Sequence, residues 1–188
     1  MRPNRPEWPI LSLLIAAAIA LASAAAAQPK PPAANPAAQA TLLGQFGDWG
    51  AYTASPGGHK VCFALSKPTS SLDVPPNRRT AANIVYLFIS TRPDENVKDE
   101  VSMLVTGYTL KGNSEAAVTV GTANFAMYTQ NDGAWVKNAA EEAQLVDAMR
   151  KGADAVVKAT TAKGTKTADT FSLKGISQAL DRAAQECK

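Results

Sequence analysis

Few residues of this chain have the types and spacing that enzyme chemistry requires. His59 is the only histidine, and it follows Gly57 and Gly58 in a segment typical of a solvated turn. A zinc site needs three or four nitrogen and sulfur ligands, which one histidine and two distant cysteines do not supply. We therefore predict no metal, no cofactor and no catalytic residues. An enzyme would need a cleft that gathers His59 with two or more carboxylates.

The carboxylates come as adjacent pairs, at residues 94–95, 99–100 and 141–142. Neighbouring residues of a strand point to opposite faces, and neighbours on a helix diverge, so none of these pairs is a ready-made acid and base. The chain also contains no Gly-x-Ser-x-Gly, no phosphate loop and no Ser-x-x-Lys.

Cys62 and Cys187 are the two cysteines of the chain. We predict a disulfide between them, which would tie the end of the domain to its beginning and stabilise it by up to about 5 kcal/mol. A redox-active pair is the alternative. It is disfavoured because the chain has no Cys-x-x-Cys and no neighbouring bases that would lower the pKa of a thiol.

A modest basic feature lies on the proline-rich segment 66–80, where Arg78 and Arg79 are adjacent and Lys67 is nearby in sequence. We interpret it first as a solvated loop. The alternative is a binding site for an acidic partner or a lipid head group, formed by Arg78, Arg79 and Lys67. Trp49 and Trp135 lie among strand residues and are expected in the core rather than as stacking platforms.

Residues 1–27 have the pattern of a secretion signal. Arg2 and Arg5 precede an apolar run, residues 10–22, which is shorter than the roughly 20 residues that a membrane-spanning helix needs. Small residues up to Ala27 suit a signal peptidase, so we predict cleavage after Ala27. An uncleaved membrane anchor is the alternative.

Residues 28–40 are rich in proline and alanine and lack apolar periodicity, which predicts a disordered linker. The folded domain is then residues 41–188. The whole chain has a net charge of +3, and loss of the signal removes more basic than acidic residues, so the domain is close to neutral. This balance does not favour nucleic-acid binding, and we predict no stable membrane span after cleavage.

Nine short strands are predicted in this domain, from alternating or continuous apolar residues bounded by glycine and proline. They cover residues 46–53, 60–65, 83–91, 100–110, 116–120, 124–130, 134–137, 155–160 and 167–171. Turns are predicted at residues 55–58 and 131–133, and a long loop at 66–80.

Two helices are predicted late in the chain. Asn138 followed by Glu141 is a variant of the capping box, and Gly152 is suited to end that helix. The second helix is predicted over residues 172–187 with Ser172 as its N-cap. Its apolar residues recur at three- and four-residue steps: Leu173, Ile176, Leu180, Ala183 and Cys187. Because no helix separates the early strands, the pattern predicts a mainly β protein, an antiparallel β-sandwich with two helices in its C-terminal half.

Several short motifs together resemble the invasion-associated locus B family of bacterial secreted or periplasmic proteins. They are Phe46-Gly47-Asp48-Trp49, Val61-Cys62, the run Asp169-Thr170-Phe171-Ser172-Leu173-Lys174-Gly175, Ala179-Leu180 and the final Cys187. The resemblance spans residues 43–187. It implies an immunoglobulin-like β-sandwich and a role in promoting invasion of host cells, and it carries no catalytic residues.

We therefore expect a non-enzymatic, periplasmic or secreted interaction protein that binds an envelope or host protein through loops such as 66–80 and 91–98. The alternative is an envelope stress or folding helper that binds apolar ligands or unfolded chains in an apolar groove. A periplasmic enzyme is the third hypothesis.

Overall fold

The computed structural model describes residues 40–188. The predicted signal peptide, residues 1–27, and nearly all of the predicted linker, residues 28–40, lie outside the described residues. Within the described part, no helix has the length and apolar character needed to cross a membrane.

One antiparallel sheet contains the strands of the described domain, in the order β1-β2-β3-β5-β6-β9-β8-β7-β10-β11-β4. The strands are β1 Thr41–Phe46, β2 Trp49–Ala54, β3 Val61–Ser66, β4 Ser70–Val74, β5 Val85–Arg92, β6 Val97–Val105, β7 Glu115–Val120, β8 Ala123–Gln130, β9 Gly133–Val136, β10 Asp154–Thr160 and β11 Lys166–Ser172. Short β9 joins the two halves of the sheet, because it pairs with β6 on one side and β8 on the other.

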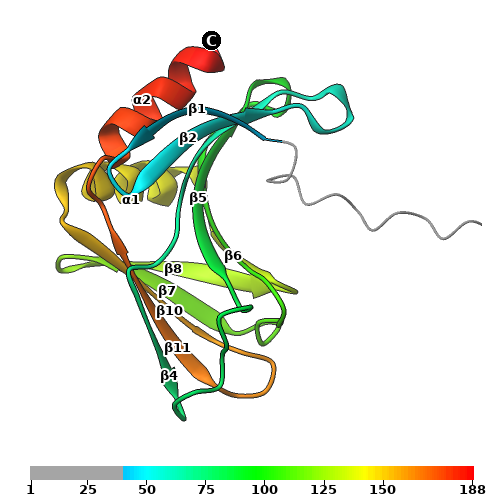
Figure 1. The fold of residues 1–188 in the computed structure, drawn as a ribbon, viewed down its shortest axis with the longest axis vertical. Helices are drawn as coiled ribbons and strands as arrows, with labels where there is room; N and C mark the ends of the chain where they lie inside the picture. Colours follow the sequence, from blue (N-terminus) through cyan, green and yellow to red (C-terminus); the bar gives the residue numbers. More distant parts are fainter. Residues whose placement is uncertain (1–39) are drawn as a thin grey trace, which may run out of the picture. The chain divides into compact units, whose positions relative to one another are not determined.

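Two helices pack against this sheet, and both lie in the C-terminal half of the chain. Helix α1, Ala139–Lys151, contacts β6 to β9, and helix α2, Ile176–Glu186, contacts β1, β2 and β3. Figure 1 shows α2 beside β1 and β2, and the group β4, β7, β8, β10 and β11 on the side away from α2. The helices therefore pack on one face of the sheet, with α2 on its first strands and α1 where the two halves join.

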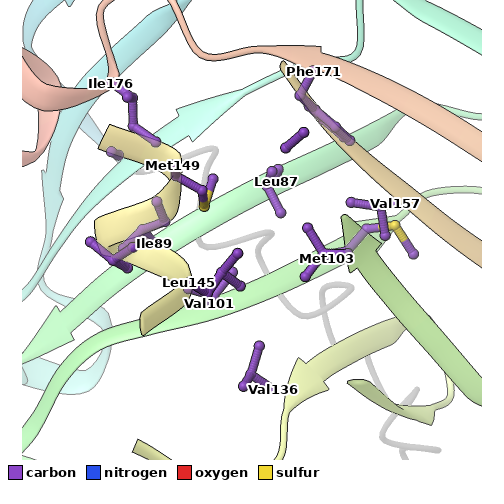
Figure 2. Close-up of a cluster of buried hydrophobic side chains, with 14 of the residues drawn as sticks. Leu87, Ile89, Val101, Met103, Val136, Leu145, Met149, Val157, Phe171 and Ile176 are labelled. Carbon is purple, nitrogen blue, oxygen red and sulfur yellow. The ribbon is translucent and has the colours of Figure 1, made fainter. Parts of the chain in front are cut away.

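The core lies between the helices and that face. Figure 2 shows Leu145 and Met149 of α1 among side chains of β5 and β6 such as Ile89 and Val101. All four are almost completely buried. They belong to one continuous cluster that includes Trp49, whose indole N–H donates a hydrogen bond of 2.8 Å to the carbonyl of Ser172. The expectation that Trp49 is a core residue is confirmed.

Helix α1 begins where the sequence indicates. The side-chain oxygen of Asn138 accepts a hydrogen bond of 2.9 Å from the N–H of Glu141. Such an N-cap satisfies a backbone donor that has no partner inside the helix. The helix ends at Lys151, and the N–H of Gly152 donates to the carbonyl of Ala148.

The prediction for the second helix was wrong at its start. Ser172 is the last residue of β11, and α2 begins at Ile176 with Gly175 as its N-cap. The chain turns sharply at Gly175, which has a positive φ of 94°. The hydroxyl of Ser172 accepts from the N–H of Lys174 in this turn and not from the helix.

Strands β1 and β4 were missed by the sequence prediction, and they are the two edges of the sheet. Neither strand contains a fully buried residue. Strand β4 lies inside segment 66–80, which was predicted to be a loop, and pairs with β11. An edge strand without a buried face has little apolar alternation, so the pattern that reveals the other strands is absent there.

The mainly β class, the antiparallel pairing and the two C-terminal helices are confirmed. The hydrogen-bonded strands form one continuous sheet, and the immunoglobulin-like sandwich stays a prediction.

Candidate functional site

The structure holds most of the Arg79 side chain in a buried ion-pair cluster. Its Nε donates to Asp73 Oδ1 at 2.6 Å, and its Nη1 lies 2.9 Å from both carboxylate oxygens of Asp169. The Arg79 and Asp73 side chains are each 8% exposed and that of Asp169 is 1% exposed. The charge of Arg79 is therefore compensated by two carboxylates, and its binding of an acidic partner or lipid head group stays a prediction.

The two carboxyl groups of this cluster differ in pKa. Burial tends to raise the pKa of Asp73, but the hydrogen bonds from Arg79 outweigh it and hold that pKa below its usual value. For Asp169, burial is the dominant effect and raises its pKa, against the opposing hydrogen bonds from Ser71 and Arg79. Arg79 thus holds the edge strand β4 to the buried side of β11.

Arg78 and Lys67 contact different residues. Arg78 is exposed, and its backbone N–H donates to Asp73 Oδ2 at 3.1 Å. The ammonium of Lys67 lies 5.5 Å from the centre of the Tyr86 ring, within the range of a cation–π interaction. Arg78 lines one cavity with Arg79, and Lys67 lines a neighbouring one with Arg79, so a shared binding site of the three stays a prediction.

A cavity of about 660 Å³ opens beside Arg79. We call it the arginine cavity. Its lining includes Arg78, Arg79, Tyr108, Thr109, Thr161, Lys163 and Thr165. Burial raises the pKa of the Tyr108 hydroxyl, against the hydrogen bond that it accepts from Arg79.

A row of aromatic side chains crosses the face of the sheet opposite the helices. Tyr52 on β2 stacks on Phe63 of β3 with ring centres 5.3 Å apart, and Phe63 contacts Phe88 of β5 at 5.5 Å. Further along, Trp135 of β9 stacks on Tyr128 of β8 at 5.7 Å. The expectation that Trp135 is a core residue was wrong, because its side chain remains partly exposed on this face.

Two glycines allow these rings to lie flat over the strands. A methyl group built on Gly50 would meet the Tyr52 ring at 2.5 Å, and one built on Gly133 would meet the Trp135 ring at 2.2 Å. Any other residue at Gly50 or Gly133 would displace the ring above it. The spacing Gly-x-aromatic is therefore the sequence signal that could have revealed this surface.

Between the two aromatic clusters lies an apolar cavity of about 340 Å³, the aromatic groove. Its apolar lining includes Phe63, Phe88, Leu104 and Trp135, and its polar lining includes His59, Lys60, Arg92, Glu95 and Glu100. The strand register brings Phe88 and Trp135 to the same groove, because Phe88 lies opposite Ser102 and Ser102 lies opposite Trp135.

Arg92 holds both carboxylates of the groove. Its Nε donates to Glu95 at 2.7 Å and its Nη2 donates to Glu100 at 2.8 Å. The hydrogen bond to Glu100 is the largest cause that raises the pKa of Arg92. His59 lies at the same groove but is exposed, and its Nδ1 is 3.5 Å from Asp94. The carboxylates are thus engaged as ion-pair partners.

The disulfide between Cys62 and Cys187 is present, with the two Cα atoms 5.9 Å apart. It joins β3 to the residue that follows α2. Lys60 reinforces the same junction through its hydrogen bond to the carbonyl of Glu186. The predicted pairing is confirmed. Within residues 40–188, no group of three or more His, Cys, Asp or Glu side chains is placed to hold a metal ion.

Comparison with family models gives a match over residues 49–184 to the family described as invasion associated locus B (IalB) protein. Comparisons with curated proteins and with solved structures gave no match.

Proposed function

Because the chain belongs to the invasion associated locus B family, we propose that it is a non-enzymatic, exported interaction protein acting in the periplasm or outside the cell. The family match covers nearly the whole described domain. A disulfide supports export, since such bonds persist in oxidising compartments. A role in promoting association with host cells is part of this proposal.

The observation that carries the proposal is the aromatic groove. Aromatic side chains offer large, rigid contact areas and are enriched where proteins bind one another. Trp135 and Phe88 are only partly buried there, and the helices cover the opposite face. Aromatic residues that remain partly exposed in a groove are typical of a binding surface rather than of a core.

The charges around the groove favour a polypeptide as the occupant. Arg92 and Lys60 lie beside Glu95 and Glu100, so donors and acceptors of both signs surround an apolar floor. We propose that the partner is an envelope or host protein that inserts an apolar or aromatic side chain between Phe88 and Trp135, with polar backbone or charged groups at the rim.

Site-specific cross-linking in intact cells tests this function. A photoreactive amino acid at Leu104 should capture a defined partner, which is then purified. That partner should bind wild-type protein and lose at least about tenfold in affinity with Trp135→Ala. Leu72→Ala is the matched control, because Leu72 is 69% exposed on the edge strand β4. Equal binding by wild type and Trp135→Ala would contradict the proposal.

A second variant separates loss of binding from loss of folding. Gly133→Ala keeps the indole but displaces it, since the new methyl group would overlap the Trp135 ring. Partner binding should weaken while Trp135 fluorescence reports a changed environment. Unchanged affinity together with a changed spectrum would show that the partner binds elsewhere.

The apolar lining also favours the alternative of a folding helper that binds unfolded chains. A helper would suppress aggregation of several unrelated reduced proteins, whereas an interaction protein would capture one partner. Trp135→Ala should abolish either activity, so the number of clients distinguishes them.

An enzyme is the third candidate, because the aromatic groove does gather His59 with Glu95 and Glu100. A general acid or base must reach the proton that it transfers. Both glutamates are instead engaged by Arg92, at 2.7 Å for Glu95 and 2.8 Å for Glu100. Any hydrolytic activity of the purified protein that Glu100→Gln abolishes would favour the enzyme over the interaction protein.

A further inference from the structure

The arginine cavity is built from three segments that are far apart in the sequence: residues 75–83, 107–109 and 161–165. Hydrogen bonds brace these walls against one another. The N–H of Ala162 donates to the carbonyl of Thr109 at 2.9 Å, and Nη1 of Arg79 donates to the hydroxyl of Tyr108 at 3.4 Å. The cavity is therefore preformed, as ligand sites commonly are.

The charges that line this cavity have one sign. Arg78, Arg79 and Lys163 line it, and no carboxylate of the described residues does. Arg79 is compensated by Asp73 and Asp169, neither of which lines the cavity. Arg78 and Lys163 are exposed and form no ion pair within residues 40–188. Two positive charges are thus available to a ligand.

The remaining lining is rich in hydroxyl groups. Tyr108, Thr109, Thr161 and Thr165 contribute them, and Asn83 adds an amide. Hydroxyls and cations together match a polar, negatively charged ligand, whereas the aromatic groove matches an apolar one. The volume exceeds what a bare anion fills and falls within the range of small-molecule sites.

We propose that the arginine cavity binds a phosphate group carried by a hydroxylated molecule, either a soluble sugar phosphate or the head group of a phospholipid. Arg78 and Lys163 bind the phosphate oxygens, and the threonine hydroxyls bind the attached polyol. This site is separate from the aromatic groove, and the inference does not depend on the proposed function.

Two-dimensional NMR with the full mature chain tests the site. Glucose 6-phosphate is the soluble probe, with glucose as its uncharged control. Saturable shifts should appear at the amides of Thr109, Thr161 and Thr165 with the phosphate only. Arg78→Gln combined with Lys163→Gln should weaken binding by roughly tenfold or more, because each charge-assisted hydrogen bond contributes substantially.

The matched control is Lys98→Gln combined with Lys137→Gln, which removes the same charge from exposed positions outside the cavity. This control should bind as wild type does. Equal weakening by both double variants would overturn the proposal, since it would indicate attraction by net charge alone. Thermal melting of each variant confirms that it is folded.

Vesicles separate the two sources of phosphate. If the ligand is a lipid, vesicles of phosphatidylglycerol should bind the protein, those of phosphatidylcholine should bind less, and the Arg78 and Lys163 variant should lose the difference. Binding of glucose 6-phosphate without vesicle binding supports a soluble ligand. Absence of binding to both probes would overturn the assignment.

Discussion

Nη1 of Arg79 lies 2.9 Å from Oδ1 and 2.9 Å from Oδ2 of Asp169, at a position where the aspartate is almost fully buried. The two residues are 90 positions apart in the sequence, and the pairing of β4 with β11 brings the segment after β4 to Asp169. No buried side-chain nitrogen or oxygen in the described domain lacks a hydrogen-bond partner. The cluster therefore stabilises the edge of the sheet only while all its members are present.

Removing Arg79 should cost far more stability than removing its neighbour. Arg79→Ala leaves Asp169 buried without its counter-ion, which we expect to lower the free energy of unfolding by about 3–5 kcal/mol. Arg78→Ala changes an exposed side chain and should cost no more than about 0.5 kcal/mol. Urea unfolding of the two single variants measures the difference. Similar midpoints for both would show that the buried ion pair is absent.

The two aspartates of the cluster should titrate on opposite sides of the ordinary value. Carboxyl-carbon NMR should find the pKa of Asp73 lowered and that of Asp169 raised. A lowered folded pKa contributes stability above the unfolded value and loses it as pH falls through the folded pKa. A raised folded pKa makes the protein relatively more stable as pH falls through it, because the folded protein binds the proton at a higher pH than the unfolded chain does.

The same shifts predict opposite effects on stability in acid. Asp73→Asn should make the loss of stability below about pH 4 shallower, since it removes a group that the unfolded chain protonates more readily. Asp169→Asn should make the protein lose more stability as pH falls toward about 4, since it removes a group that the folded chain protonates more readily than the unfolded chain does in that range. Unfolding curves between pH 3 and 7 distinguish the two, and changes of the same sign would refute the assigned shifts.

Replacing Gly175, in the turn before α2, should destabilise the protein more than replacing a glycine of positive φ in open space. A methyl group there would lie 1.9 Å from the carbonyl oxygen of Phe46, and the residue has a positive φ. Gly164 also has a positive φ, yet nothing lies within 4 Å of its methyl position. Gly164→Ala should cost about 1–2 kcal/mol and Gly175→Ala clearly more. Equal costs, measured by thermal melting, would argue against the close packing of α2 on β1.

The disulfide should hold α2 against the sheet. Replacing both cysteines, Cys62→Ala with Cys187→Ala, should lower the free energy of unfolding by about 2–5 kcal/mol and speed hydrogen exchange in α2. Reducing agent should destabilise the wild-type protein and leave this variant unchanged. Intact mass of exported protein provides the direct check, and two free thiols there would contradict the pairing.

Strong periodic patterns allowed the sequence to predict much of the fold. Local patterns predicted the buried strands β5 and β6 and the Asn138 cap of α1. Elimination predicted the disulfide, because the chain has two cysteines. Strands β1 and β4 escaped prediction because edge strands bury no complete side chain. Ser172 was misassigned as a cap because β11 continues through it, and the chain enters α2 only at Gly175, which has the positive φ of that turn.

Sequence alone determined the domain class and the family, because alternation, turns and short motifs are properties of neighbouring residues. Tertiary structure alone decided the sites. It moved Arg79 from a presumed binding loop to a buried ion pair, and it moved Trp135 from a presumed core to a groove with Phe88. The physical reason is register: which face a strand residue occupies, and which charge lies opposite it, depends on a partner strand that the local pattern does not specify.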